Sequence, residues 1–228
     1  MELSSIFSPW KFTYREDEEQ QQFDKNGKPL PPTYKTYEII MLEGDNYRKL
    51  IEVEGHPPDA KLQKKIDDDL EKERSIRRAR RGGTLSTTRT AHFPGLEDLE
   101  RLFDNNVTGD EVIAGRDAWR VESVPKVNYK AANKEDQELM ASRKTSWFDR
   151  REGVWLKQET VLLRAVNGEQ PGTHLDLTRG KHGDAWLIDE ILFRTDTKFA
   201  PMVRVRGQDR RTFYDYRKFD VETKIILQ

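Results

Sequence analysis

Histidine is the residue type in this chain best suited to acid–base or metal chemistry, and the chain has four histidines and no cysteine. His174 and His182 fall in one predicted hairpin, with Asp176 and Asp184 nearby, so a strand pair could bring them together. Histidines at the ends of strands are more often exposed to solvent than bound to a metal. We therefore predict no metal site and no cofactor.

Two charge clusters share one predicted helix, and each has a chemical and a structural interpretation. Residues 67–69 are three consecutive aspartates, which point in different directions on a helix and so favour a solvated face over a cation site. Five arginines follow between positions 74 and 81. Basic residues stabilise the C-terminal end of a helix, so we interpret them as structural and not as a phosphate or nucleic-acid site.

Catalytic signatures are missing from the sequence. We find no nucleophile elbow, no Walker loop and no dinucleotide-binding glycine pattern. Carboxylates are so frequent in this chain that a pair of them is no evidence of a catalytic site. We predict that the protein is not an enzyme.

Tryptophans carry more information than the charged residues. Four of them, Trp119, Trp147, Trp155 and Trp186, lie in strand-like segments of the second half. Adjacent strand residues point to opposite faces, so the pair Trp147-Phe148 predicts apolar surface on both faces of a sheet. These rings either belong to an ordinary core or line a cavity.

The composition limits what the elements around these residues can be. The chain has 228 residues, 40 basic and 41 acidic side chains and a mean hydropathy of −0.91. This length fits a single domain spanning residues 1–228. The balanced charge gives no net positive electrostatic field that would attract nucleic acid. No apolar run is long enough to cross a membrane.

The hydrophobic pattern predicts an α+β fold dominated by one antiparallel sheet. Strands alternate with turns over residues 10–55 and again over 107–227, and the interlude 58–104 is predicted to be helical. The interlude contains a helix over 60–81 and a short second helix over 96–103. The polar stretch 126–138 is predicted to be a loop or crossover.

This order of strands, helix and long antiparallel run resembles the bacterial outer-membrane lipoprotein-sorting (LolA/LolB-like) superfamily, in particular its uncharacterised secreted members. The resemblance spans residues 12–219 and rests on structural segments. They are FTYREDEE, FDKNGKP, KTYEIIMLEGDNYRKLIEVEGHPP, GRDAWRVESVPK, SWFDRREGVWLKQE and FYDYRKF.

The resemblance implies an incomplete β-barrel, in which helices cover the concave side of a strongly curved sheet. Relatives of that shape hold acyl chains or lipoprotein anchors, so we expect a periplasmic or secreted protein that binds a lipid or an acylated peptide between sheet and helical lid. The expected cavity or lid residues are Leu62, Ile66, Leu70, Leu99, Leu102, Phe103, Trp119, Trp147, Trp155 and Trp186.

A second hypothesis uses the same fold without a cavity. A filled core would leave a sheet edge or face to bind another protein, as an interaction or sensor module does. An apolar cavity would favour the first hypothesis, and an exposed apolar patch over a filled core would favour the second.

Overall fold

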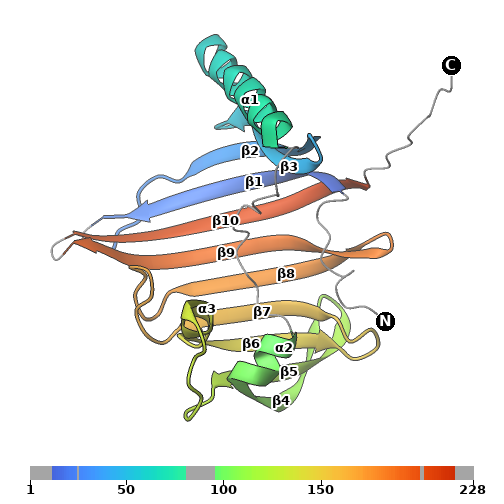
Figure 1. The fold of residues 1–228 in the computed structure, drawn as a ribbon, viewed down its shortest axis with the longest axis vertical. Helices are drawn as coiled ribbons and strands as arrows, with labels where there is room; N and C mark the ends of the chain where they lie inside the picture. Colours follow the sequence, from blue (N-terminus) through green and yellow to red (C-terminus); the bar gives the residue numbers. More distant parts are fainter. Residues whose placement is uncertain (1–11, 25, 81–95, 201–202, 219–228) are drawn as a thin grey trace.

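Strands dominate the computed structural model, which describes residues 12–24, 26–80, 96–200 and 203–218 (Figure 1). This part of the chain forms ten strands and three helices. They are β1 Phe12–Phe23, β2 Thr33–Leu42, β3 Asp45–Val53, α1 Ala60–Arg80, α2 Leu96–Leu102, β4 Phe103–Ile113, β5 Arg116–Pro125, α3 Lys134–Leu139, β6 Ser142–Asp149, β7 Trp155–Leu162, β8 His174–His182, β9 Ala185–Ala200 and β10 Val203–Lys218.

All ten strands form one antiparallel sheet in the order β3-β2-β1-β10-β9-β8-β7-β6-β5-β4. Strand β1 lies between β2 and β10, which joins the N-terminal meander to the C-terminal strands. Among the described residues the two edge strands β3 and β4 do not pair with each other, so the sheet is open. The predicted run of consecutive antiparallel strands in the second half is confirmed for β4 to β10, with helix α3 between β5 and β6 as the exception.

Several hairpins close through a residue followed by glycine, both with positive φ. Ala114 and Gly115 have φ of 49° and 77°, and Asn167 and Gly168 have φ of 49° and 92°. Two consecutive positive φ angles give a turn whose twist matches that of the flanking strands. The turns predicted at Gly153, near Gly168 and near Gly183 are all present, and each of these glycines has positive φ.

One face of the sheet is unexpectedly polar. Directly paired residues share a face, so the strand register traces a row of side chains across seven strands. The row consists of Val121, Ser146, Gln158, Leu177, Ile191, Arg211 and Glu18. Ser146, Gln158 and Glu18 are buried in it.

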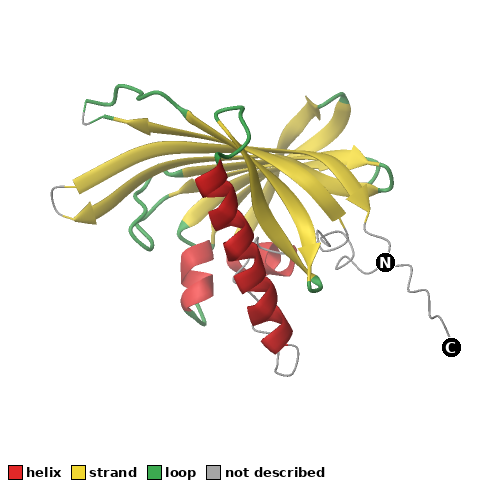
Figure 2. Cartoon of the chain, turned by 90° about the horizontal axis from the view of Figure 1, so that it is seen from above, coloured by secondary structure: helices red, strands yellow, loops and turns green. Residues whose placement is uncertain are grey.

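All three helices lie on this same side of the sheet, which we call the helix side (Figure 2). Tyr37 pairs with Glu16 and therefore lies on the same face of the sheet as Glu18. Tyr37 also lines a small cavity together with Leu62 and Ile66 of α1, which places α1 on that face. Helix α1 lies near the β2–β3 edge, whereas α2 and α3 lie at the β4–β7 end (Figure 1).

Three local predictions need correction or fall outside the described residues. Phe103 pairs with Pro125 and begins β4, so it does not end the second helix and the strand starts before Val107. The predicted loop contains helix α3, which begins after Asn133 because the Asn133 side chain caps it. The predicted strand 221–227 lies outside the described residues.

The apolar core is divided into two clusters of buried residues. The first is formed by Leu99 and Leu102 of α2 together with Phe103 and Met140. Ala118, Trp147, Leu156 and Trp186 form the second. Trp147 and Ser146 are adjacent and so lie on opposite faces, which places the ring of Trp147 on the face away from the helix side.

Candidate ligand-binding pocket

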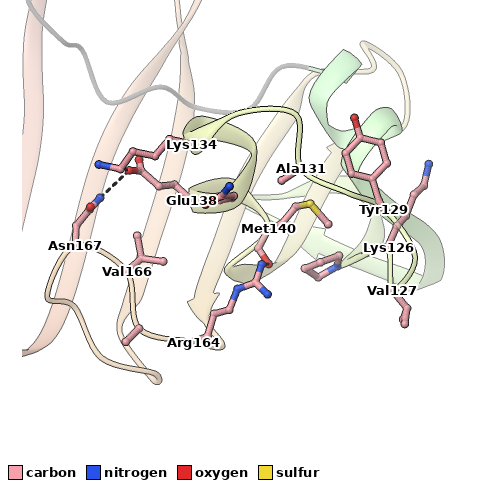
Figure 3. A pocket seen from close by; sticks show the side chains of 13 residues that line it. Lys126, Val127, Tyr129, Ala131, Lys134, Glu138, Met140, Arg164, Val166 and Asn167 are labelled. Atoms are coloured by element: carbon pink, nitrogen blue, oxygen red, sulfur yellow. Dashed lines mark hydrogen bonds and ion pairs between the residues drawn. The ribbon is translucent and has the colours of Figure 1, made fainter.

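A cavity of about 680 Å³ lies beside α3, between the segment that leads into this helix and the loop from β7 to β8 (Figure 3). We call it the α3 pocket. Its lining side chains are of two kinds, seven apolar or aromatic and six polar. They are Pro125, Val127, Tyr129, Ala131, Met140, Ala165 and Val166, and Lys126, Lys134, Gln137, Glu138, Arg164 and Asn167.

A buried carboxylate holds the pocket's helix in place. Asp136 accepts hydrogen bonds from both terminal nitrogens of Arg101 on α2, each at 2.8 Å, and from the backbone nitrogen of Ala132 at 3.0 Å. Arg101 also donates to the hydroxyl of Tyr129 at 3.1 Å. The bonds from Arg101 lower the pKa of the Asp136 carboxyl below its usual value. This network joins α2, α3 and the lining residue Tyr129.

The opposite wall is anchored by backbone contacts of the β7–β8 loop. Backbone nitrogens of Leu163 and Arg164 donate to the carbonyl of Ala141, at 2.8 and 3.3 Å. The Asn167 side chain donates to Glu138 at 3.0 Å, so it connects the loop to α3. The loop is therefore fixed to Ala141, just before β6, and to α3, and the pocket does not depend on a free loop.

The apolar part of the lining is continuous with the first core cluster through one residue. Met140 is buried in that cluster and also faces the pocket. Val127, by contrast, is 92% exposed. A valine that remains this exposed beside a cavity leaves apolar surface in contact with water, which an apolar ligand would cover.

A second, smaller cavity of about 220 Å³ lies under α1. Leu62 and Ile66 line it from the helix, and Leu50 lines it from β3. Arg48, Lys65 and Asp69 also line it, and the guanidinium of Arg48 lies 3.3 Å from the centre of the Tyr37 ring. Arg48 forms ion pairs with the buried Glu16 and Glu18, at 2.7 and 3.0 Å.

The ten residues predicted to form a cavity or lid do not come together at one site. Leu62 and Ile66 lie under α1, and Leu70 is half-buried farther along the same helix. The other seven fall into three environments. Leu99, Leu102 and Phe103 lie in the first core cluster, Trp147 and Trp186 in the second, and Trp119 and Trp155 lie beneath the guanidinium groups of Arg150 and Arg179.

Lys144 is a buried cation on the helix side, next to the first core cluster. Its ammonium lies 4.1 Å from the centre of the Phe103 ring and donates to the Ser142 hydroxyl at 2.9 Å. Burial lowers the pKa of Lys144 to about 7. Lys144 does not line the α3 pocket.

The described residues form no candidate metal-binding group and no helix that could cross a membrane. No group of three histidine, aspartate or glutamate side chains there is placed to hold a metal ion. His182 bonds to Asp189 at 2.6 Å and not to Asp184. None of the described helices is long and apolar enough to cross a membrane.

Most of the pocket residues were missed by the sequence analysis because they lie in the stretch interpreted as a loop. The one local signal was Asn133 followed three residues later by Asp136, a spacing in which the first side chain caps a helix. Nothing in the sequence placed Arg164 and Asn167 beside that helix. The β7–β8 loop reaches it only through tertiary structure.

Solved structures of low sequence identity are similar to this chain over most of its length. A DUF1329 family protein from Desulfovibrio piger is 12% identical, with 99% of this chain and 90% of that chain covered and a TM-score of 0.41. An outer membrane lipoprotein-sorting protein domain from Vibrio parahaemolyticus is also 12% identical, with the same coverage and a TM-score of 0.40. A LolA superfamily protein from Nitrosomonas europaea is 9% identical, with 98% and 93% covered and a TM-score of 0.34.

No family model and no curated protein matches the chain. Two of these similar structures are described as a lipoprotein-sorting protein domain and as a LolA superfamily protein, the superfamily that the sequence segments resemble. At this identity and these TM-scores, the similarity says nothing of what this chain binds.

Proposed function

We propose that this protein binds a hydrophobic ligand, a lipid or an acylated peptide, in the α3 pocket and performs no catalysis on it. The volume of the pocket, about 680 Å³, is the observation that carries the proposal. Binding sites for small molecules span about 300–1,000 Å³ and have largely apolar walls. Seven of the thirteen lining residues are apolar or aromatic. Each methylene moved from water into such a wall contributes about 0.8 kcal/mol.

The space under α1 supports a ligand site less well. Its volume of about 220 Å³ lies below that range. The helix side of the sheet also carries buried Glu18, Gln158 and Ser146. These groups already bond to protein partners, Glu18 to Arg48 and Gln158 to Ser146, so that part of the surface offers an alkyl chain little apolar area. We therefore assign α1 to covering its end of the sheet and place the ligand beside α3.

We also propose that the protein works in the cell envelope. This proposal rests on the resemblance of the sequence segments to the lipoprotein-sorting superfamily. Among the described residues no constellation of nucleophile, base and orienting group lines the α3 pocket, and this supports a binding role over a catalytic one.

A matched pair of valine substitutions tests the location of the site. Val127→Glu adds a charge to the lining at a 92% exposed position, so the fold should tolerate it. We expect Val127→Glu to weaken binding of a fluorescent fatty acid about tenfold or more. The control Val112→Glu changes an equally apolar, 67% exposed residue that is not part of the pocket, and should bind as the parent does.

Fluorescence of the probe itself is the readout, because no tryptophan lines the pocket. Circular dichroism checks that each variant keeps its strands. Absence of probe binding by the parent, at concentrations below probe aggregation, would remove the proposed function.

The interaction-module hypothesis keeps one supporting observation. Strand β4 is an edge strand, and Val107 and Val112 on it are 68% and 67% exposed. The register places both on the same face as Trp119, which is 39% exposed. An apolar strip beside an open strand edge suits an added strand from a partner protein. Acidic residues on β4, Asp110 and Glu111, are the kind of charge that protects such an edge from non-specific pairing.

A further inference from the structure

The α3 pocket carries more positive than negative charge. Lys126, Lys134 and Arg164 line it, and Glu138 is its one lining carboxylate. Glu138 is engaged on both sides, because Lys134 lies 3.4 Å from it and Asn167 donates to it at 3.0 Å. Lys134 and Glu138 therefore balance each other, and the charge of the other two cations is not offset within the lining.

Those two cations are held in place by neutral partners. The guanidinium of Arg164 donates to the backbone carbonyl of Met140 at 3.1 Å. The ammonium of Lys126 donates to the backbone carbonyl of Glu100 at 2.8 Å. Within the described part of the chain, no carboxylate lies within ion-pair distance of either side chain. A carbonyl orients a cation without neutralising it, so both remain able to bind an anion.

The position of these cations relative to the apolar wall indicates which chemical class of ligand the pocket takes. Arg164 lies next to Met140, with Val166 on one side of it, and Lys126 is adjacent in sequence to Val127 (Figure 3). Each cation thus stands beside an apolar lining residue. A purely apolar ligand would leave both cations facing it unpaired, and a small free anion would leave the apolar wall in contact with water.

We propose that the α3 pocket selects an amphipathic anion, a hydrocarbon chain that ends in a phosphate or carboxylate group. Arg164 binds the oxygens of the anionic group, Lys126 adds positive charge at the other end of the pocket, and Val127, Tyr129 and Met140 contact the chain (Figure 3). Arginine can donate two parallel hydrogen bonds to such a group, which fixes its orientation. This proposal rests on the function proposed above and specifies the class of ligand that the same site prefers.

Calorimetric titration of the full chain with three probes tests the selectivity. Dodecyl phosphate carries both features, 1-dodecanol carries the hydrocarbon alone, and inorganic phosphate carries the anion alone. We expect dodecyl phosphate to bind about tenfold or more tightly than dodecanol, and inorganic phosphate to bind weakly. All titrations stay below the concentration at which dodecyl phosphate forms micelles.

Charge variants assign the selectivity to residues. Arg164→Gln removes the charge and keeps a polar side chain. We expect its preference for dodecyl phosphate over dodecanol to fall to about threefold or less. Lys126→Gln should reduce it in the same direction. The control Arg217→Gln removes one positive charge from an exposed position on β10, outside the pocket, and should keep the full preference.

The outcomes separate the two proposals. Equal binding of dodecyl phosphate and dodecanol would overturn the preference for an anion and leave hydrophobic binding standing. Tight binding of inorganic phosphate alone would overturn the amphipathic ligand. Binding of none of the three would remove the proposed function together with this inference. A preference that survives in Arg164→Gln and Lys126→Gln would overturn the assignment to these residues.

Discussion

Lys144 shows how much a single buried charge costs this fold. Its ammonium is buried among Phe103 and the ends of α3 without a carboxylate to pair with among the described residues, and its pKa is lowered to about 7. Below pH 7 the folded protein must keep a desolvated charge, whereas the unfolded chain holds that charge in water. We therefore expect the lysine at this position to destabilise the protein at neutral and acidic pH.

Replacing that charge should stabilise the protein. We expect Lys144→Met, which keeps an unbranched side chain, to raise the free energy of unfolding at pH 6.5 by roughly 1–3 kcal/mol. Between the folded pKa of about 7 and the ordinary value of 10.5, the unfolded chain binds more protons than the folded protein, so the stability of the parent rises with pH there. The difference in free energy of unfolding between the variant and the parent should therefore become smaller as the pH rises through this range.

Urea unfolding of both proteins at pH 6.5 and pH 9.5 measures this difference. Other groups that titrate in this range, including the buried tyrosines, are common to both proteins and cancel in the comparison. A variant less stable than the parent at pH 6.5 would show that Lys144 contributes more through its contact with Phe103 and its hydrogen bonds than its burial costs.

At the scale of elements, the short helix α3 depends on a network that joins it to α2. Six residues are too few for a stable isolated helix, so the Asn133 cap and the bonds between Asp136 and Arg101 must hold it. Because α3 forms one side of the pocket, its attachment to α2 is also a condition for ligand binding.

Asp136→Asn should therefore lower both stability and ligand affinity. The amide keeps the size of the carboxylate, but it cannot accept two charged hydrogen bonds from Arg101 with the same strength. We expect a melting temperature several degrees lower and clearly weaker binding of the fluorescent fatty acid. The stability that Asp136 contributes is present above its unfolded pKa and is lost as pH falls through its lowered folded pKa, so the variant should lose this acid-dependent part.

Asp68→Asn is the matched control, since Asp68 is exposed on α1 and makes no bond to α3. Unchanged melting and probe binding in Asp136→Asn would show that α3 holds its position without this carboxylate.

Elements with a strong periodic pattern could be predicted from the sequence, and short ones that depend on tertiary contacts could not. Helix α1 was predicted over 60–81 and spans Ala60–Arg80, because its leucine and isoleucine spacing and its charge order are local properties. Helix α3 has no apolar periodicity of its own. Its position is determined by Arg101, which is 35 residues away from Asp136 in the sequence.

At the scale of the whole molecule, alternation along the strands predicted one antiparallel sheet, and the pairing of β1 with β10 completes it. The location of the site was harder to predict. Large apolar side chains indicated a cavity between sheet and helices, yet Trp147, Trp186, Leu102 and Phe103 pack into two filled clusters. The remaining space lies where a loop and a short helix meet, and no hydrophobic pattern marks such a place.

The central claim is that a hydrocarbon chain binds beside α3 and not under α1. A photoreactive fatty acid with a diazirine near the end of its chain tests this directly, because illumination attaches it to the residues that it contacts. Peptide mass spectrometry then locates the attachment. We predict labelling within residues 126–140 or 164–167, reduced by Val127→Glu and unaffected by Val112→Glu. Labelling of Leu50, Leu62 or Ile66 instead would place the ligand under α1 and contradict the account.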